Sequence, residues 1–373
     1  MGKKDVKIGV ALSGGGIRAT IFHLGLFKWL AENELMENIK HISSVSGASI
    51  AVGLIYTYNN MKWPTNREYL EEVLPNLKTA ILKEDVQNKT LITSLKKPWK
   101  LFGSKSNILA EAMEKCWKIK GTFGELPAYP AWSVNCTTFE TGKNFRFSQK
   151  FSGDYKIGYF DSKDFPLVNA IASSAGFPFL VGMYKLDTRK YNWYDYGSED
   201  KKILEHDHIH LWDGGVYDNL GLEAIYKMGN GGACRKGVDF CIVSNASAGS
   251  AEFTESGRSI LEKLGDTKRL LDIAMDQIGA LRSREYMAFI TEKKAGMYVQ
   301  IGNSAEKITS SGKLDEKIKE ELLKECLKEE DCVKVKTYKT TLNKPTETDY
   351  NLILRHGYEN AKCVYYSYDS ILK

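Results

Sequence analysis

The sequence lacks any long apolar run and has few features of a secreted or metal-binding chain. No stretch of eighteen or more apolar residues occurs among its 373 residues, which excludes a transmembrane helix. Its start has no apolar signal-peptide core, so we expect a cytoplasmic protein that acts on any lipid only peripherally. Its seven cysteines are scattered and form no C-x-x-C pair. This pattern is typical of reduced thiols and favours neither a zinc ribbon nor a disulfide framework.

The remaining composition is that of an ordinary globular protein. Hydrophobic residues make up 43% of the chain and charged residues 27%, and the length suffices to bury a sizeable core. The formal net charge of +5 permits weak attraction to an anionic membrane surface but does not indicate a nucleic-acid-binding protein. No repeat or linker divides the chain, so we predict one domain over residues 5–361.

Two strand–turn–helix units open the chain. An apolar run at residues 6–12 breaks at glycines and continues as an apolar helical pattern over 17–30. A second predicted strand, 39–45, meets small residues and is followed by an apolar helical pattern to residue 58. This order predicts an α/β fold, in which a mainly parallel central sheet is flanked by helices in three layers.

Later segments extend this scheme. Strand character returns at residues 132–137, 144–148, 209–212, 240–244 and 297–301. We interpret residues 60–125 as a helical insertion or cap. We interpret residues 256–373 as a mostly helical C-terminal part of the same domain, with a charged helix over 314–328.

Residues 13–18, S-G-G-G-I-R, lie between the first predicted strand and its helix. Three glycines allow a tight turn and leave backbone N–H groups exposed at a helix N-terminus, which suits a bound phosphate or an oxyanion formed during reaction. Residues 14–19 also fit the dinucleotide fingerprint G-x-G-x-x-A. However, the acidic residue expected about 20 residues later is missing, and the second strand ends in serines. A purely structural turn is the third alternative.

Ser46 lies at the next strand-to-helix junction, in the sequence S-V-S-G-A-S. It is a degenerate nucleophile elbow, because Ser44 and Ala48 replace the glycines of G-x-S-x-G but are still small enough for the turn. Gly47 leaves its N–H available to an oxyanion, and the following helix directs its positive end at Ser46. Taken alone, such a run of small residues more often only packs a strand against a helix.

Asp213 follows a predicted strand and begins the sequence D-G-G-V-Y-D-N-L-G. By itself this is an ordinary Asp-Gly turn. In order, however, the three segments resemble the patatin-like phospholipase family, whose pattern is a glycine-rich oxyanion loop, an elbow serine and a D-G-[GA] aspartate. Residues 134–142, 172–178 and 354–361 are similar to the family as well, so the resemblance covers most of the chain. It departs at the elbow, where family members usually have G-x-S-x-G.

The resemblance implies a serine esterase that cleaves acyl esters of phospholipids or related lipids without a cofactor. Ser46 would attack the ester, and Asp213 would accept the serine proton directly, as a Ser–Asp dyad. The implied oxyanion hole consists of backbone amides, those of Gly14, Gly15, Gly16 and Gly47. Arg18 would steady this loop or contact a lipid phosphate, with solvent-side packing as the alternative. None of the six histidines lies in a motif that marks a triad base.

Other segments have weaker interpretations. The alternating histidines of residues 206–210 could hold a metal, but a solvated strand edge is favoured, and we expect no metal site. His23 in the first helix is interpreted as a buried core histidine. Two aromatic-rich stretches, 96–105 with Trp99 and Phe102 and 183–196, fit either a lipid headgroup surface or ordinary packing. The rival function is a non-catalytic lipid- or nucleotide-binding module, against which the retention of both Ser46 and Asp213 argues.

Overall fold

The structure is a computed structural model that describes residues 6–96, 105–176, 182–229, 231–235, 237–249, 260–312 and 314–372. Trp99 and Phe102, predicted to contact lipid, lie outside these ranges. None of the helices in them combines the length and apolar character needed to cross a membrane.

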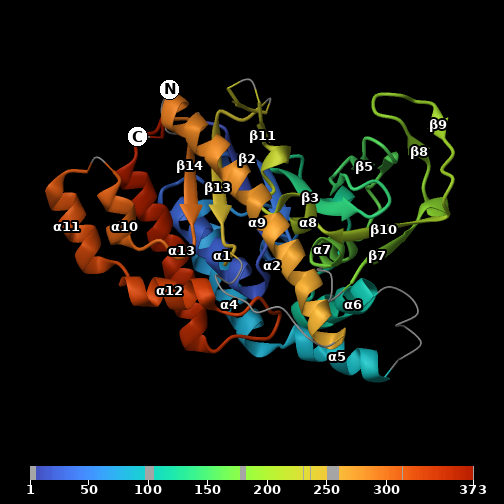
Figure 1. Cartoon of the computed structure of the whole chain (residues 1–373), viewed down its shortest axis with the longest axis horizontal. Coiled ribbons are helices and arrows are strands. Elements are labelled where there is room, and N and C mark those ends of the chain that lie inside the picture. Colours follow the sequence, from blue (N-terminus) through green and yellow to red (C-terminus); the bar gives the residue numbers. More distant parts are fainter. Residues whose placement is uncertain are drawn as a thin grey trace.

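Parallel strands form one side of the sheet (Figure 1). In spatial order from the edge strand inward they are β14 (Gly296–Gln300), β13 (Phe240–Asn245), β1 (Ile8–Leu12), β2 (Ile39–Val45) and β3 (Ala131–Thr138). Leu12 lies beside Ser44 in the register of β1 and β2. Because both strands end at this level, the glycine-rich segment and Ser46 leave the sheet at the same edge.

An antiparallel extension continues the sheet beyond β3. It contains β4 (Asn144–Phe147), β5 (Phe151–Asp154), β6 (Gly158–Asp161), β8 (Trp193–Tyr194) and β9 (Lys201–Lys202). Strand β10 (His208–Asp213) pairs with both β3 and β7 (Tyr184–Asp187), and a small separate hairpin joins β11 (Tyr226–Lys227) to β12 (Ala233–Cys234). Asp213 lies opposite Cys136 of β3, which brings the aspartate to the edge where Ser46 leaves the sheet.

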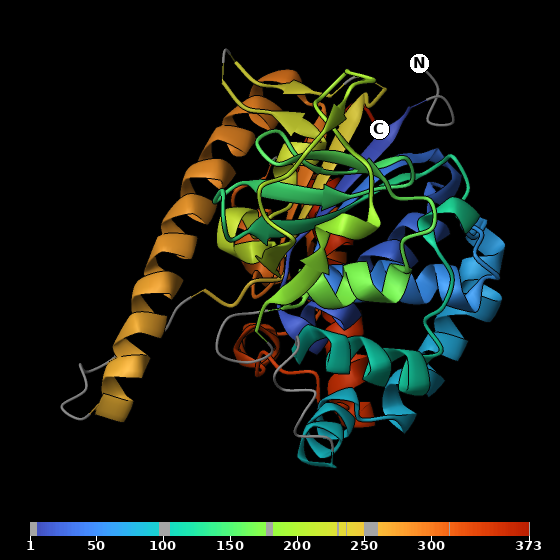
Figure 2. The same ribbon diagram turned by 90° about the vertical axis from the view of Figure 1, so that its right-hand side faces the viewer.

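Helices cover both faces of the sheet, as the alternation of strand side chains shows. Val10 and Leu12 point into the large core under α1 (Gly16–Glu32), α2 (Gly47–Tyr58), α7 (Leu167–Ser174) and α13 (Glu347–Ser367). Ala11, between them, points into a smaller core with Tyr286 and Phe289 of the long helix α9 (Ile260–Lys293). In Figure 2, α9 runs along one side of the molecule and its first turns project beyond the body. The predicted three-layer α/β class is confirmed.

Shorter helices surround this framework. The segment after α2 contains α3 (Asn66–Glu68), a π-helical turn (Tyr69–Val73), α4 (Leu74–Lys83), α5 (Val86–Lys96) and α6 (Lys105–Trp117). The later helices are α8 (Gly215–Asp218), α10 (Ala305–Ser310), α11 (Glu316–Glu325) and α12 (Glu329–Thr337). Single 3-10 turns occur at Met36–Asn38, Phe123–Glu125, Thr188–Lys190 and Leu222–Ala224. Both groups of helices contribute to the large core, for example through Leu77 and Val335.

Helices α1 and α13 cross at two glycines. A Cβ atom on Gly25 would lie 2.1 Å from the Leu354 carbonyl oxygen, and one on Gly357 would lie 2.0 Å from the Phe22 carbonyl oxygen. The two backbones are therefore in direct contact, and this contact fixes α1, which begins in the glycine-rich segment.

We predict that Gly357→Ala destabilises the protein by about 1–3 kcal/mol or more, because the two helices must separate to accept the methyl group. Gly279→Ala is the control, since a Cβ there meets no atom within 4 Å. That change should be neutral or stabilise the fold by up to about 1 kcal/mol, because alanine favours a helix interior. Urea unfolding measures both variants. Equal stability of the two would contradict the close crossing.

Candidate active site

Ser46 occupies a strained turn between β2 and α2. Its φ of 54° and ψ of −119° are unusual for a residue other than glycine and cost on the order of 1–3 kcal/mol. Its backbone N–H donates to Ser174 Oγ at 2.9 Å, which helps to hold the turn. Ser46 is partly exposed while Val45 and Gly47 are buried, as expected for a nucleophile elbow.

Hydroxyl groups beneath the elbow explain its departure from the G-x-S-x-G pattern. Ser44, which stands in the first glycine position, accepts from the Trp132 indole N–H at 2.9 Å. Its hydroxyl also lies 2.9 Å from that of Ser49, which in turn lies 3.0 Å from Ser174 Oγ. Ser174 donates to the Asn135 carbonyl at 2.7 Å. The serines at this junction thus form a connected, buried support for the turn.

The glycine-rich loop packs directly on the elbow. A Cβ on Gly47 would lie 2.1 Å from the Gly16 carbonyl oxygen, and a Cβ on Gly14 would lie 3.0 Å from Ser46 Cβ. Gly15 and Gly16 have φ values of 147° and 61°, which glycine adopts most readily. The N-termini of α1 and α2 are therefore held side by side at the serine.

The backbone N–H groups near Ser46 differ in whether a protein acceptor already binds them. The Gly14 N–H donates to the Asn219 carbonyl at 3.2 Å, so that amide is engaged in the resting structure and does not have the free N–H that the sequence suggested. Within the described ranges, the N–H groups of Gly15, Gly16 and Gly47 donate to no protein acceptor. They lie at the starts of two helices, where unpaired donors and the helix dipole favour an anion.

Arg18 lies inside the protein. Its guanidinium donates to the Ala246 carbonyl at 3.3 Å from both Nε and Nη2, and to the Tyr338 carbonyl from Nη1. Burial lowers the pKa of Arg18 to about 10. Solvent-side packing is therefore wrong for this residue. The contacts tie the start of α1 to the ends of β13 and α12, which supports the loop-steadying role rather than contact with a lipid phosphate.

His23 is the buried core histidine expected from the sequence. Its Nδ1 lies 3.0 Å from Ser244 Oγ, and its Nε2 lies 2.9 Å from the Ser13 carbonyl oxygen. Burial lowers the pKa of His23 to about 4, so the imidazole is neutral near pH 7. It fixes the backbone at the start of the glycine-rich loop.

Asp213 ends β10 and is only 2% exposed. Its Oδ1 accepts from the Gly215 N–H at 2.7 Å, and Thr137 Oγ1 donates to its backbone carbonyl at 3.0 Å. Burial raises the pKa of Asp213 to about 7, and the Gly215 N–H and the nearby Ser46 side chain oppose this rise. The carboxylate is therefore adjacent to the serine and unusually basic for an aspartate.

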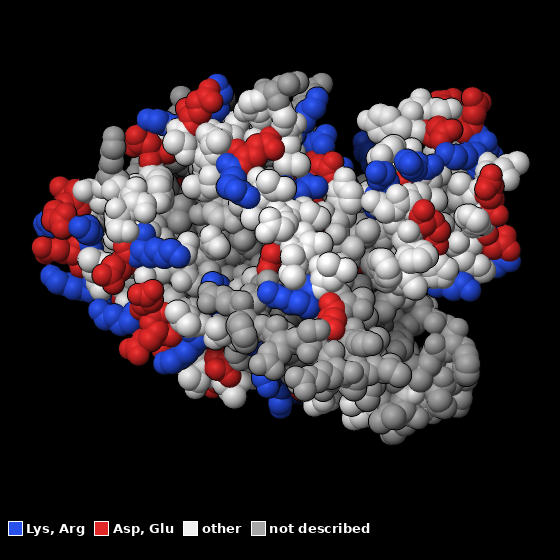
Figure 3. Space-filling model, viewed as in Figure 1, with Lys and Arg blue, Asp and Glu red and all other residues white. Residues whose placement is uncertain are grey.

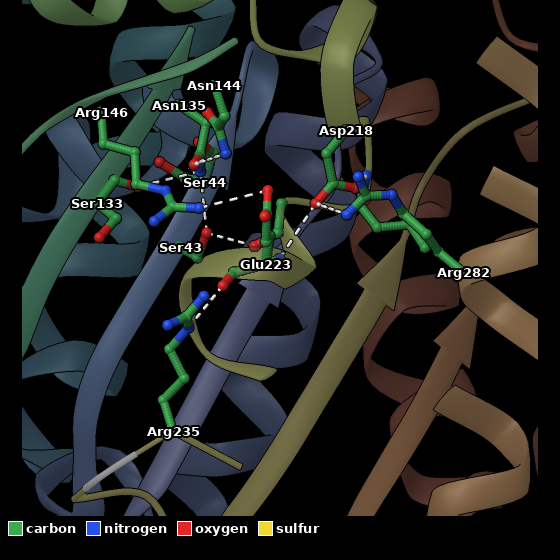
Figure 4. A network of polar contacts seen from close by, with 12 residues as sticks. Ser43, Ser44, Ser133, Asn135, Asn144, Arg146, Asp218, Glu223, Arg235 and Arg282 are labelled. Carbon is green, nitrogen blue, oxygen red and sulfur yellow. Dashed lines mark hydrogen bonds and ion pairs between the residues drawn. The ribbon is translucent and has the colours of Figure 1, made fainter. Parts of the chain in front are cut away.

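A polar network holds the segment after Asp213 against the elbow strand (Figure 4). The Asp218 carboxylate pairs with Arg282 of α9 at 3.1 Å and accepts from the Glu223 backbone N–H at 3.1 Å. Ser43 donates to the Gly221 carbonyl, and the Asn135 amide donates to Ser43 Oγ at 2.9 Å. These contacts therefore link the segment after Asp213 to β2, β3 and α9. The side chains that make them form no recognisable sequence motif.

Ser46, Asp213 and Gly14–Gly16 open into one cavity of about 1990 Å³. Residues of α9, β14 and the end of α13 also line this cavity. All six histidines lie in the described ranges and none lines this cavity. Of the histidines at 206–210, His210 Nδ1 contacts Glu140 at 2.7 Å, and the described part of the chain contains no cluster of ligands suited to a metal.

An α/β sheet with a positive-φ serine at a strand-to-helix turn is typical of serine hydrolases. The family model of patatin-like phospholipases matches residues 10–226, more than half of the chain. The protein therefore belongs to the patatin-like phospholipase family, a family of lipid acyl hydrolases.

Solved structures of similar fold have low sequence identity. Human GIVD cytosolic phospholipase A2, in a complex with methyl gamma-linolenyl fluorophosphonate and terbium chloride, is 12% identical. The alignment covers 96% of this chain and 58% of that one, with a TM-score of 0.49. VipD from Legionella pneumophila is 14% identical over 97% of this chain and 67% of its own, with a TM-score of 0.42. The chain thus spans little more than half of the human enzyme. No curated protein sequence matches it.

The raised pKa of Asp213 predicts a pH-dependent cost to stability. The folded state binds the carboxyl proton of Asp213 more tightly than the unfolded chain does, because the pKa is about 7 in the folded state and about 3.9 in the unfolded chain. The protonated carboxyl therefore contributes its full stabilisation below about pH 4, and this contribution is lost as the pH rises to about 7. Asp213→Asn is neutral throughout. It should exceed wild type in unfolding free energy by on the order of 2–4 kcal/mol at about pH 8 and by less at about pH 5.

Urea unfolding at both pH values measures this difference. The exposed Asp161→Asn is the control and should stay within about 0.5 kcal/mol of wild type. A gain for Asp213→Asn that did not change with pH would argue against a raised pKa.

Proposed function

We propose that this protein is a lipid acyl hydrolase, a serine esterase of phospholipase A or lysophospholipase type, in which Ser46 is the nucleophile and Asp213 its base. The observation that carries the proposal is the buried Asp213 carboxylate, which lines the same large cavity as Ser46 and whose pKa the nearby Ser46 side chain lowers, while no histidine lines that cavity. A direct proton transfer from serine to aspartate needs no third residue.

The reaction begins when Ser46 Oγ attacks the ester carbonyl carbon and Asp213 accepts the hydroxyl proton. The carbonyl oxygen becomes an oxyanion, to which the amides of Gly15, Gly16 and Gly47 donate in this proposal. Collapse of the tetrahedral intermediate expels the alcohol, which takes the proton from Asp213. Water then attacks the acyl-serine with Asp213 as base, and the fatty acid and free Ser46 are released.

The basicity of Asp213 suits this role. An ordinary aspartate, with a pKa of about 3.9, is a poor base toward a serine hydroxyl. Burial raises the pKa of Asp213 to about 7, near the pH at which a general base works best. The two helix N-termini at Ser46 lower the energy of the negative charge that develops there.

The cavity supports a lipid substrate. Its volume of about 1990 Å³ exceeds the roughly 300–1,000 Å³ of ordinary small-molecule sites. Apolar side chains contribute to its walls, among them Leu91, Leu109, Met275, Met287, Ile290 and Val364. A cavity with such walls has room for long acyl chains beside the serine, and a lipid of this kind is reached at a membrane surface.

Ser46→Ala should abolish hydrolysis of acyl esters, with a loss of at least about a thousandfold in kcat, because the nucleophile is removed. The variant should fold normally. Ser94→Ala is the matched control, since Ser94 also lines the cavity and donates to the Thr90 carbonyl within its own helix. Turnover of a soluble p-nitrophenyl ester measures both. A fully active Ser46→Ala protein would overturn the assignment.

Asp213 predicts the shape of the pH profile. Because the protonated carboxyl cannot accept a proton, kcat/KM should rise about tenfold per pH unit up to about pH 7 and then level off. Asp213→Asn should lower kcat by on the order of a hundredfold to ten-thousandfold with little change in KM. A mild effect of Asp213→Asn, together with a large loss from one histidine substitution, would indicate a triad instead.

A further inference from the structure

Helix α9 exposes an apolar stripe to solvent. Between residues 270 and 288 its exposed side chains recur at three- and four-residue steps and so share one face. They are Leu270, Ile273, Ala274, Gln277, Ala280, Leu281, Arg284 and Ala288. The large members are well exposed, at 68% for Leu270, 42% for Ile273 and 61% for Leu281. The stripe contains no carboxylate, and its single charge is positive.

This composition is unusual for the outer face of a surface helix. The exposed side chains of α11 in the same protein are Glu316, Lys317, Ile318, Glu320, Glu321, Lys324 and Glu325. Figure 3 shows acidic and basic side chains interspersed over the side of the molecule that carries α10 to α12. The opposite face of α9 already packs on the body through Tyr286 and Phe289. Apolar side chains thus lie on both the inner and the outer face of α9, which is typical of a helix whose outer face is also covered.

The stripe borders the cavity that contains Ser46. Ala280 and Arg284 belong to the stripe and also line that cavity, together with their neighbours Met275 and Gly279. Anything that lies on the stripe therefore lies next to the candidate active-site cavity. A lipid surface at this position would supply acyl chains beside the cavity, whereas a protein partner would cover its edge.

The size and charge of the stripe also favour a lipid surface. From residue 270 to residue 288 the helix rises by about 27 Å, and with a helix width of about 10 Å the stripe covers roughly 270 Å². A stable interface between two copies of the chain needs about 800 Å² on each partner. Insertion of a few apolar side chains into a bilayer needs no such area, and Arg284 suits the phosphates of the headgroups.

We propose that the outer face of α9 docks the protein on a phospholipid surface, with Leu270, Ile273 and Leu281 inserted among the headgroups and the cavity beside the docked face. The inference rests on the proposed function in one respect, since the docked lipid is the source of the substrate. The docking itself requires no catalysis.

Sedimentation with vesicles of diether phosphatidylcholine and diether phosphatidylglycerol tests the docking, because ether lipids cannot be hydrolysed. The full chain should bind, and Leu270→Gln/Ile273→Gln/Leu281→Gln should weaken binding at least about tenfold through lost apolar burial. The control replaces exposed apolar side chains outside the stripe, as Ile318→Gln/Val333→Gln/Ile371→Gln, and should change binding less than about twofold. Both variants should hydrolyse a soluble short-chain ester like wild type, because none of these residues lines the cavity.

Three results would overturn the docking proposal. The first is that the wild-type protein does not bind the vesicles, and the second is that the stripe variant binds them as tightly as wild type. The third is that light scattering shows a wild-type dimer, which the stripe substitutions convert to a monomer without a change in vesicle binding. In that case the stripe would be an interface between two copies of the chain. Loss of Ser46-dependent ester hydrolysis alone would contradict only the proposed function, since binding to ether lipid is measured without it.

Discussion

The backbones of Gly16 and Gly47 lie in contact, and the geometry of the site depends on that contact. A Cβ on Gly47 would come within 2.1 Å of the Gly16 carbonyl oxygen, so only glycine allows the two helix N-termini to meet at Ser46. The parallel register of β1 and β2 delivers both turns to one edge of the sheet. Arg18 and His23 then hold the glycine-rich loop from inside the protein through backbone carbonyls.

The central part of the fold could be predicted because its signals are local. The strand predicted at 39–45 coincides with β2, and the serine that follows it stands at the predicted turn. Strands expected at 240–244 and 297–301 were found within one residue at each end, since buried parallel strands are continuous apolar runs. The order of the glycine loop, Ser46 and Asp213 indicated the family, and the match over residues 10–226 confirmed it.

The supporting shell of the site could not be predicted, because its contacts join distant parts of the chain. Ser174 accepts a hydrogen bond from the Ser46 N–H although the two residues are 128 positions apart in the sequence. The Asn219 carbonyl accepts from the Gly14 N–H, which the sequence predicted to be available to an oxyanion. Hydropathy gave no sign that Arg18 would be enclosed by the C-terminal segment. The helix predicted over 314–328 ends at Glu325 because the Leu327 N–H donates to the Glu359 carboxylate at 2.7 Å instead of continuing the helix.

The central claim is that the Ser46 hydroxyl is activated for attack on acyl esters. Fluorophosphonates form a stable bond only with a serine made nucleophilic by its surroundings, so the modified residue reports the site directly. We predict that peptide mapping by mass spectrometry after labelling places a single adduct on Ser46, and that the adduct disappears in Ser46→Ala. An adduct on Ser43, Ser44 or Ser49, or labelling that persists without Ser46, would contradict the account.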